Sequence, residues 1–509
     1  MQSPPTPETS TGEGAPASPA PTATSSAGTN KLVVKNTIYL TLSQALTVPI
    51  SLVINAVGGR YLGSEAFGIA YFTTTLCTLG FLAVNWGHEG VLPAVVARSH
   101  AAAPLMLGSS IVWRLLSSVV VYAVMAFGCH YFGYNEDVQW ALALTAVYAL
   151  LTSLVAACKD TIRGLERAEI PAIAHVAQQL LGAFIVVPIL LLGGKLNATL
   201  FGHVAACAAV LVAIVFALRP AGVRGVQVSW DAIKKLFSGG TPFVILNLAM
   251  ALQPNIDAIF LSKLAPTEVM GWYAVTRRLV GVILFPAAAL IGALYPTLCR
   301  LHGTDESGFL RTVSGALRSV ALLVIPLAVG CALFPEIAIS MFSREKFGPA
   351  EDNLRILAPF VFLVYFSMPL GTAILASGKQ RAWSIVQSLC VVVSLALDPL
   401  LVPWFQARTG NGGMGLCVAT FVSELVVVVC GLLLAPRGIF DRKFARTMAF
   451  GALSGAAMAL VGRLAAPLTV WLAAPLALLT YIGVLLATGG IEREQLAALR
   501  GFIGRRFSR

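Results

Sequence analysis

Charged residues are scarce in this chain. Asp, Glu, Lys and Arg make up 11% of its 509 residues, whereas 57% are hydrophobic. A water-soluble core cannot enclose so much apolar surface, which excludes a soluble globular protein. Runs such as 111–128, 172–193 and 384–404 each approach or exceed the roughly 20 residues that a helix needs to cross a bilayer. The composition therefore predicts an integral membrane protein.

Close cysteine pairs and long loops are also lacking. The nine cysteines show neither a disulfide-like pairing nor a metal-binding spacing, so we interpret them as packing residues. Residues 1–30 are rich in Pro, Ser, Thr, Ala and Gly without an apolar run, which predicts a disordered tail. No loop between predicted helices exceeds about 25 residues, so there is no room for a soluble catalytic domain. The function must therefore lie between the helices.

A short motif occurs twice. Arg60 to Gly68 and Lys263 to Gly271 each contain a basic residue, a leucine and then Glu-x-x-Gly, at the start of an apolar segment. Six hydrophobic segments separate the copies, as in a transporter built from parallel repeats. We predict an all-α membrane protein with an N-terminal six-helix bundle (31–235), a C-terminal six-helix bundle (236–436) and two additional helices (437–490). The fourteen predicted transmembrane helices are 36–57, 68–87, 104–128, 138–158, 171–193, 197–218, 240–262, 272–297, 312–334, 354–376, 382–405, 412–435, 446–463 and 467–488.

The loop charges set the predicted orientation. The net charge of +12 is better explained by membrane topology than by nucleic acid, which we exclude as a partner. About 24 Lys and Arg lie on the side of the N-terminus and about 10 opposite, which places both termini in the cytoplasm of a cell (inner) membrane protein. We predict amphipathic surface anchors at Glu336 to Arg355 on the outer side and in the cytoplasmic tail 491–509.

Three stretches resemble a known family. They are Leu62 to Gly68, Gly271 to Leu279, and Leu397 to Pro403 followed by Gly415 to Glu424. In this order they resemble the polysaccharide-transporter branch of the MOP superfamily, the Wzx-type oligosaccharide flippases, which are related to MurJ and to MATE exporters. The resemblance implies that two bundles alternate access to a central polar cavity. It implies transfer of a polyprenyl-diphosphate-linked oligosaccharide to the outer leaflet, with glycosyltransferases and a glycan polymerase as partners.

Ionisable residues inside predicted helices are the candidates for binding such a substrate. A buried diphosphate needs cations, and the planar guanidinium of Arg114 suits a phosphate. A structural pairing of Arg114 with Glu89 or a helix carbonyl is the alternative. Arg277 and Arg278 are about 100° apart around their helix. We expect Arg278 to face the interior, as the resemblance implies, and Arg277 to reach the outer headgroups. The alternative is that both arginines anchor the helix at the membrane interface. Glu424, a mid-helix charge, is the fourth substrate-binding candidate.

Oxygen ligands on three predicted helices suit a coupling cation. Ser394 and Asp398 share a helix face, and Asp257 and Thr420 lie at a similar depth. Such a set suits Na⁺ or a shared proton. The resemblance implies a sodium site at these positions, although Ser394 stands where an amide is expected. The alternative is that both aspartates pair with neighbouring backbone donors at kinked helices.

Other functions are less compatible with the sequence. A MATE-like cation-coupled drug exporter should carry carboxylates in its N-terminal bundle, where Arg114 is the isolated mid-helix charge. A glycan polymerase or ligase should carry a large outer loop with acidic, Arg or His residues, and the longest outer loop is short and lacks histidine. We therefore predict a transporter rather than an enzyme, with no cofactor beyond a coupling Na⁺ or H⁺.

Overall fold

The computed structural model describes residues 26–465, 467 and 469–490. That part of the chain is helical and contains no strand, because backbone polar groups in lipid must pair within their own segment. The predicted amphipathic tail 491–509 and residues 1–25 of the predicted N-terminal tail lie outside the described residues. Residues 26–30, predicted to be disordered, begin the first helix instead.

The helices are α1 (Ser26–Asn85), α2 (His88–Arg98), the short 3₁₀ helix η1 (His100–Ala102), α3 (Ala103–Tyr131), α4 (Glu136–Gly164), α5 (Glu169–Leu191), α6 (Leu196–Leu218), α7 (Trp230–Leu264), α8 (Thr267–Leu301), α9 (Glu306–Leu333), α10 (Pro335–Ser340), α11 (Arg344–Phe347), α12 (Ala350–Ala376), α13 (Gln380–Thr409), α14 (Gly413–Leu434), α15 (Arg442–Leu464) and α16 (Val470–Ala487).

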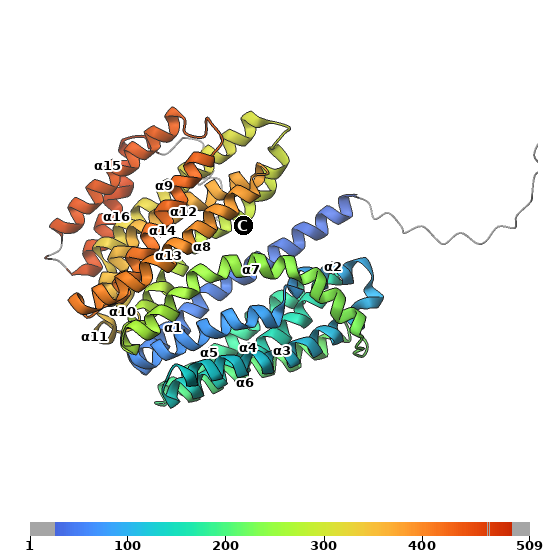
Figure 1. The fold of residues 1–509 in the computed structure, drawn as a ribbon. Coiled ribbons are helices and arrows are strands. Elements are labelled where there is room, and N and C mark those ends of the chain that lie inside the picture. Colours follow the sequence, from blue (N-terminus) through green and yellow to red (C-terminus); the bar gives the residue numbers. More distant parts are fainter. Residues whose placement is uncertain (1–25, 466, 468, 491–509) are drawn as a thin grey trace, which may run out of the picture.

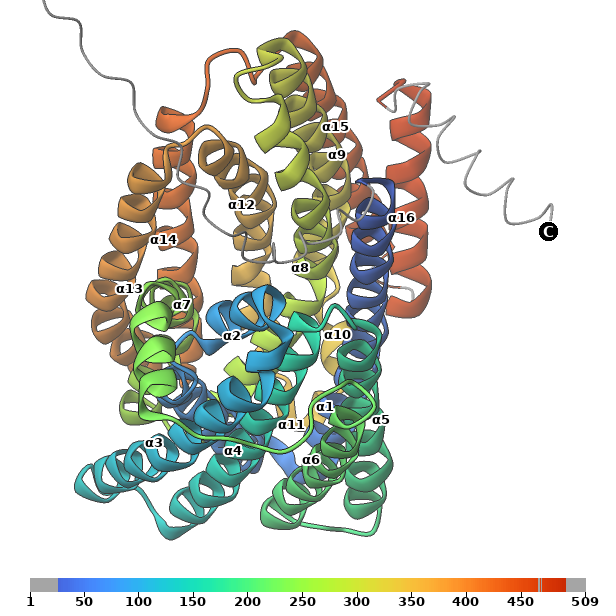
Figure 2. The same cartoon turned by 90° about the vertical axis from the view of Figure 1, so that its right-hand side faces the viewer.

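Two groups of helices make up the molecule (Figures 1 and 2). Helices α1–α6 form the N-terminal half, α8–α14 form the C-terminal half, and α7 runs between them. Helices α15 and α16 lie on the flank of the C-terminal half, where α15 packs against α9 and the Tyr481 hydroxyl donates to the Leu322 carbonyl at 2.8 Å. The two additional helices therefore contact the C-terminal half.

The number of membrane crossings differs from the prediction. Twelve helices in the described part of the chain are long and apolar enough to span a membrane, so the predicted count of fourteen is not confirmed. The first two predicted helices are joined in α1, where Gly63, at φ 85° and ψ 175°, breaks the helical geometry between them. Helix α7 is not among the twelve.

Helix α7 packs against both halves, rather than belonging to the C-terminal bundle alone. Near its start, the Phe237 ring stacks on Trp86 with centroids 4.4 Å apart. Gly87 and Gly240 bring α7 so close to the N-terminal half that a Cβ on Gly240 would overlap the Trp86 carbonyl oxygen. The later part of α7 packs against α13. The sequence boundary at residue 236 therefore falls inside a helix that both halves share.

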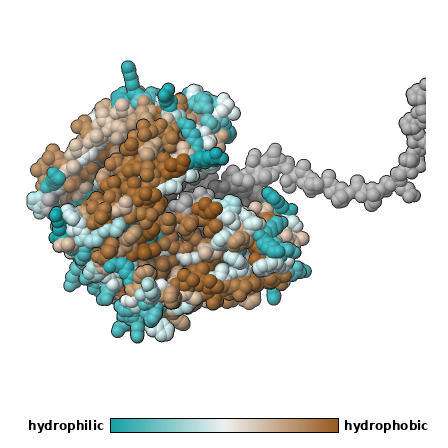
Figure 3. Space-filling view, in the orientation of Figure 1, coloured by the Kyte–Doolittle hydropathy of each residue, from teal (hydrophilic) through white to brown (hydrophobic). Residues whose placement is uncertain are grey.

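Hydrophobic side chains cover the middle of the face seen in Figure 3, and hydrophilic ones gather toward the helix ends. Several helices begin at these ends with a side-chain cap. Asn135 Oδ1 accepts from the Val138 N–H at 3.1 Å, and Asp305 Oδ1 accepts from the Gly308 N–H at 2.8 Å. Such caps pair backbone donors that the first helical turn leaves free. The polarity pattern agrees with a multi-pass membrane protein.

The two copies of the repeated motif contact each other. A Cβ on Gly68 would overlap the Thr267 carbonyl oxygen, and one on Gly271 would overlap the Ser64 carbonyl oxygen. Only glycine permits this approach of α1 and α8. The Ser64 hydroxyl also donates to Glu268 Oε1 at 3.1 Å. The motif therefore closes one end of the interface between the halves, which we call the motif end.

The segment α10–α11 reinforces this closure from outside. We call residues 335–347 the strap. Arg60 of α1 donates through Nε to the Met341 carbonyl and through Nη2 to the Ser340 carbonyl, both at 2.8 Å. In return, Lys346 Nζ donates to the Arg60 carbonyl at 2.8 Å. Polar contacts in both directions thus tie the strap to the N-terminal half.

Two phenylalanines of the strap are fully buried between the halves. The rings of Phe342 and Phe347 meet Phe67 edge-on, with centroids 6.1 and 5.9 Å away. Gly59 provides the space, since a Cβ there would lie 2.8 Å from Phe342. The sequence suggested a surface anchor for this stretch. Its aromatic residues point instead into the protein interior, where they bury apolar area shared by the two halves.

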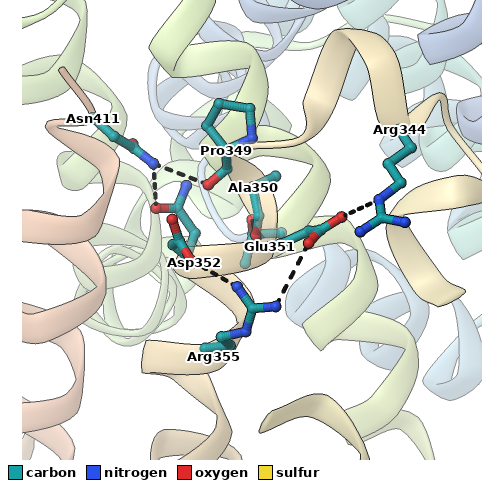
Figure 4. Close-up of polar contacts among 9 residues, drawn as sticks. Arg344, Pro349, Ala350, Glu351, Asp352, Arg355 and Asn411 are labelled. Atoms are coloured by element: carbon teal, nitrogen blue, oxygen red, sulfur yellow. Dashed lines mark hydrogen bonds and ion pairs between the residues drawn. The ribbon is translucent and has the colours of Figure 1, made fainter. Parts of the chain in front are cut away.

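One ion pair ties the base of the strap to the C-terminal half, beside further polar contacts at the start of α12 (Figure 4). Arg344 Nε lies 2.9 Å from Glu351 Oε1, and Arg355 Nη2 lies 3.6 Å from Glu351 Oε2. Asn411, in the turn between α13 and α14, donates to the Pro349 carbonyl at 3.0 Å. The strap is therefore held at its base by the C-terminal half and along its length by the N-terminal half.

Adding a methyl group at the motif contact should open the motif end. We expect Gly271→Ala to force α1 and α8 apart, because the new Cβ would overlap the Ser64 carbonyl. Gly315→Ala in α9, where a Cβ meets nothing within 4 Å, is the matched control. The measurement is labelling of a cysteine placed at Ser64, in a background without native cysteines, by an impermeant maleimide added at the motif end. Equal labelling in both variants would contradict the glycine closure.

Candidate functional site

A cavity of about 530 Å³ lies between the two halves. We call it the central cavity. One part of its wall is apolar, with Leu52, Leu284 and Phe285, and another carries neutral polar groups such as Asn55 and Gln179. No carboxylate lines it within the described residues. This lining suits an amphiphilic molecule whose polar part is not a cation.

Arg277 and Arg278 of α8 both line the central cavity. The expectation that Arg277 reaches the outer headgroups is therefore wrong. The carboxylate of Asp257 is buried, and its charge attracts Arg277 inward. Arg278 Nε is buried and has no hydrogen-bond partner among the described residues. A buried donor on a cation without a partner is costly, so Arg278 is well placed to bind an anionic group.

A second, smaller cavity lies inside the N-terminal half. Its volume is about 260 Å³, and we call it the side cavity. It is lined mainly by residues of α1, α4, α5 and α6, with Arg278 reaching in from α8. Ser51, Asn55, Gln179 and Arg278 line both cavities. The two cavities therefore share a wall at which Arg278 supplies the positive charge.

Asp257, Ser394 and Asp398 form a buried cluster, as the sequence predicts. Their exposed fractions are 2%, 1% and 0%. The Ser394 hydroxyl lies 3.4 Å from Asp257 Oδ1 and 3.3 Å from Asp398 Oδ2. No group of three His, Cys, Asp or Glu that could hold a metal ion occurs in the described part of the chain. Two carboxylates and a hydroxyl are hard oxygen donors, which fit Na⁺ or a proton.

Thr420 and Glu424 of α14 are buried but have other partners. The Thr420 hydroxyl donates to the Leu416 carbonyl of its own helix at 2.8 Å. Glu424 accepts a hydrogen bond from the Ser367 hydroxyl of α12. Neither residue lines the central or the side cavity. In this conformation Glu424 joins two helices of the C-terminal half.

Tyr273 connects the acidic cluster with the central cavity. Its hydroxyl donates to Asp257 Oδ2 at 2.8 Å. Tyr273 precedes Arg277 by four residues and so shares its helix face. The ring of Tyr71, from α1, lies 6.2 Å from the Tyr273 ring, and Tyr71 also interacts with Arg277. Sequence reasoning missed both tyrosines, although the spacing of Tyr273 and Arg277 was a usable signal.

Arg114 lies away from both cavities and is 1% exposed. Its Nε donates to the Ser110 hydroxyl at 3.2 Å, and its Nη1 donates to Asn85 Oδ1 and to the Ser153 hydroxyl, both at 2.9 Å. No carboxylate lies within ion-pair distance of Arg114 in the described structure. These bonds join α3 to α1 and α4, which favours the structural alternative over substrate binding.

Comparison with known proteins agrees with this architecture. The family model described as polysaccharide biosynthesis protein matches residues 33–302, more than half of the chain. The chain belongs to this family. A second family model, MatE, matches residues 242–400. A curated relative, the probable flippase AglR of Haloferax volcanii, is 21% identical over 281 residues. That match covers 55% of this chain and spans only 57% of the relative.

Solved structures share the fold of this family member. The lipid II flippase MurJ, in an inward closed conformation, has a TM-score of 0.69 at 14% identity and covers 90% of this chain and 100% of its own. A MATE transporter of the MOP superfamily, in an inward-facing conformation, has a TM-score of 0.63 at 15% identity, covering 78% of this chain and 96% of its own. The fold is therefore that of MOP superfamily transporters, as the sequence motifs indicated.

Removing Arg114 should lower stability. We expect Arg114→Ala to lower the free energy of unfolding by at least about 2 kcal/mol, because the acceptors of Asn85 and Ser153 would stay buried without a charged donor. The measurement is thermal unfolding of the purified protein in detergent, with Arg278→Ala, whose Nε has no partner to lose, as the control. An Arg114→Ala protein that unfolds like the wild type but no longer binds substrate would restore the substrate role that the sequence predicted.

Proposed function

We propose that this protein is a flippase that moves a polyprenyl-diphosphate-linked oligosaccharide from the cytoplasmic to the outer leaflet of the cell membrane. The observation that carries this proposal is the pair Arg277 and Arg278 in a cavity without carboxylates between the two halves. A diphosphate cannot enter hydrocarbon unpaired, and guanidinium groups are its strongest side-chain partners. The apolar wall of the same cavity suits the start of the lipid chain.

The direction of transfer follows from topology. With both termini in the cytoplasm, as the Lys and Arg distribution favours, the motif end faces outward. The glycine contact and the strap then close the outer end, so that this conformation accepts substrate from the cytoplasmic side. The relatives support the assignment, since two of them are named flippases. Glycosyltransferases that complete the glycan, and a polymerase that uses it, are the partners such a flippase would serve.

We further propose that Asp257, Ser394 and Asp398 bind the coupling Na⁺ or H⁺. Asp257 uses Tyr273 and the charge of Arg277 to offset its burial in the absence of that ion. Once a cation neutralises the aspartates, Arg277 loses its main counter-charge inside the C-terminal half and becomes available to an anion in the central cavity. The two sites are thereby coupled through one arginine, which gives the reciprocity that coupled transport requires.

A cation-coupled exporter like the MATE proteins is the second candidate. The MatE family model matches residues 242–400, which include the acidic cluster up to Asp398. That match concerns the proposed coupling site and leaves the substrate open. The arginines of the central cavity repel cationic drugs, so the exporter would need an anionic substrate.

Neutralising Arg278 should strongly reduce flipping. We expect Arg278→Gln to reduce transfer roughly 10- to 100-fold, the effect of losing one charge-assisted hydrogen bond. Arg311→Gln, an exposed arginine at the start of α9, is the matched control. The measurement is transfer of a fluorescent lipid-linked oligosaccharide in proteoliposomes, together with complementation of a flippase-deficient strain. Efflux of a small amphiphile without lipid transfer by the wild type would favour the exporter instead.

Removing one aspartate charge should remove ion dependence. We expect Asp257→Asn and Asp398→Asn each to make transfer independent of a Na⁺ or pH gradient, because two carboxylates are needed to attract the cation into a buried site. Glu306→Gln, which removes an exposed carboxylate at the start of α9, is the control. Transfer rates are compared with and without each gradient. If transfer still depends on a Na⁺ or pH gradient in both variants, the proposed cation site is wrong.

A further inference from the structure

The side cavity has a lining that the transport of a diphosphate does not need. About half of its lining residues carry neutral polar groups, among them Asn55, Thr145, Gln179 and His203. Arg278, on the wall shared with the central cavity, is the one charged residue among the lining residues described. A cavity in this part of a membrane protein would be cheaper to fill with apolar side chains, since unpaired polar groups are costly there. The lining therefore points to a polar, uncharged ligand.

Several lining groups have free hydrogen-bonding capacity. Within the described part of the chain, the side chains of Gln179 and His203 have no hydrogen-bond partner. The Asn55 amide nitrogen donates to the Ser51 carbonyl at 2.7 Å, which leaves the Asn55 carbonyl oxygen free. Donors and acceptors thus occur together at the wall. A sugar hydroxyl both donates and accepts, so it can pair with each of these groups.

Aromatic surface completes the lining. The Tyr148 and His203 rings lie 5.8 Å apart at an angle of 59°, and Tyr71 borders the same space. Ring faces provide apolar contact beside the polar groups, which matches the mixed C–H and O–H surface of a pyranose. At about 260 Å³ the cavity lies below the 300–1,000 Å³ range typical of drug-sized ligands. It holds one sugar residue rather than a whole oligosaccharide.

The wall shared by the two cavities indicates which position in the oligosaccharide this sugar occupies. Ser51, Asn55, Gln179 and Arg278 face both cavities. A diphosphate held by Arg277 and Arg278 in the central cavity would place its directly attached group at this wall. We propose that the side cavity is a specificity subsite for the neutral sugar linked directly to the diphosphate. This inference rests on the proposed flippase function and adds that the N-terminal half recognises the sugar of the substrate.

Binding to full-length purified protein tests the subsite. The probes are farnesyl diphosphates whose terminal phosphate carries glucose, galactose or N-acetylglucosamine, and the reference is the P²-methyl ester, which has the same charge but no sugar. We expect at least one sugar probe to bind about 3- to 10-fold more tightly than the methyl ester, the scale of one to two neutral hydrogen bonds. Gln179→Leu and His203→Leu should each reduce that gain. His203 lines the side cavity but not the central cavity, so His203→Leu should leave the affinity for the methyl ester unchanged.

A glutamine away from the side cavity provides a matched control. Gln139 of α4 donates to the Tyr134 carbonyl at 3.0 Å and does not line the cavity, so Gln139→Leu should keep the sugar gain. Arg278→Gln should weaken binding of all probes. Thermal unfolding of each variant verifies that the fold is retained.

The outcomes separate the two proposals. If the wild type binds neither the sugar probes nor the methyl ester, the flippase proposal itself fails, and the subsite with it. If it binds all probes equally, the diphosphate site stands and the sugar subsite is overturned. A sugar gain that persists in both Gln179→Leu and His203→Leu would also overturn the subsite, because the sugar would then be recognised elsewhere.

Discussion

The structure depends on a close approach of two backbones at the motif end. Gly68 and Gly271 allow α1 and α8 to come together so closely that neither position has space for a side chain. Because this contact joins the two halves at one end only, it also defines where a cavity between them can exist. Arg277 and Arg278 follow Gly271 on the same helix, so the glycine contact determines their position relative to α1 and the side cavity.

Much of this architecture could be predicted from the sequence. The apolar runs predicted a polytopic helical protein, and the order of short motifs indicated the MOP superfamily. The spacing of Ser394 and Asp398 correctly predicted that they share a face near Asp257. The sequence could not show which side chains contact each buried charge. From the sequence, Arg114 was a candidate for binding an anionic ligand, but in the structure three neutral residues from α1, α3 and α4 accept its hydrogen bonds.

The distribution of charge between the halves differs from what Arg114 suggested. The sequence made this arginine of the N-terminal half a candidate for the diphosphate, beside Arg277 and Arg278 of the C-terminal half. In the structure, both cavity arginines and the aspartates come from the C-terminal half or its neighbour α7, while the N-terminal half supplies neutral polar groups. Charge recognition and recognition of neutral groups are thus carried by different halves.

Helix α7 gives this arrangement a mechanical consequence. Its beginning is fixed to the N-terminal half by the stacking of Phe237 on Trp86 and by the Gly87–Gly240 approach. Asp257, near its other end, belongs to the acidic cluster. Phe237 and Asp257 are about 20 residues apart on α7, which corresponds to about 30 Å along the helix axis. One continuous helix therefore joins the acidic cluster directly to the contact with Trp86 in the N-terminal half.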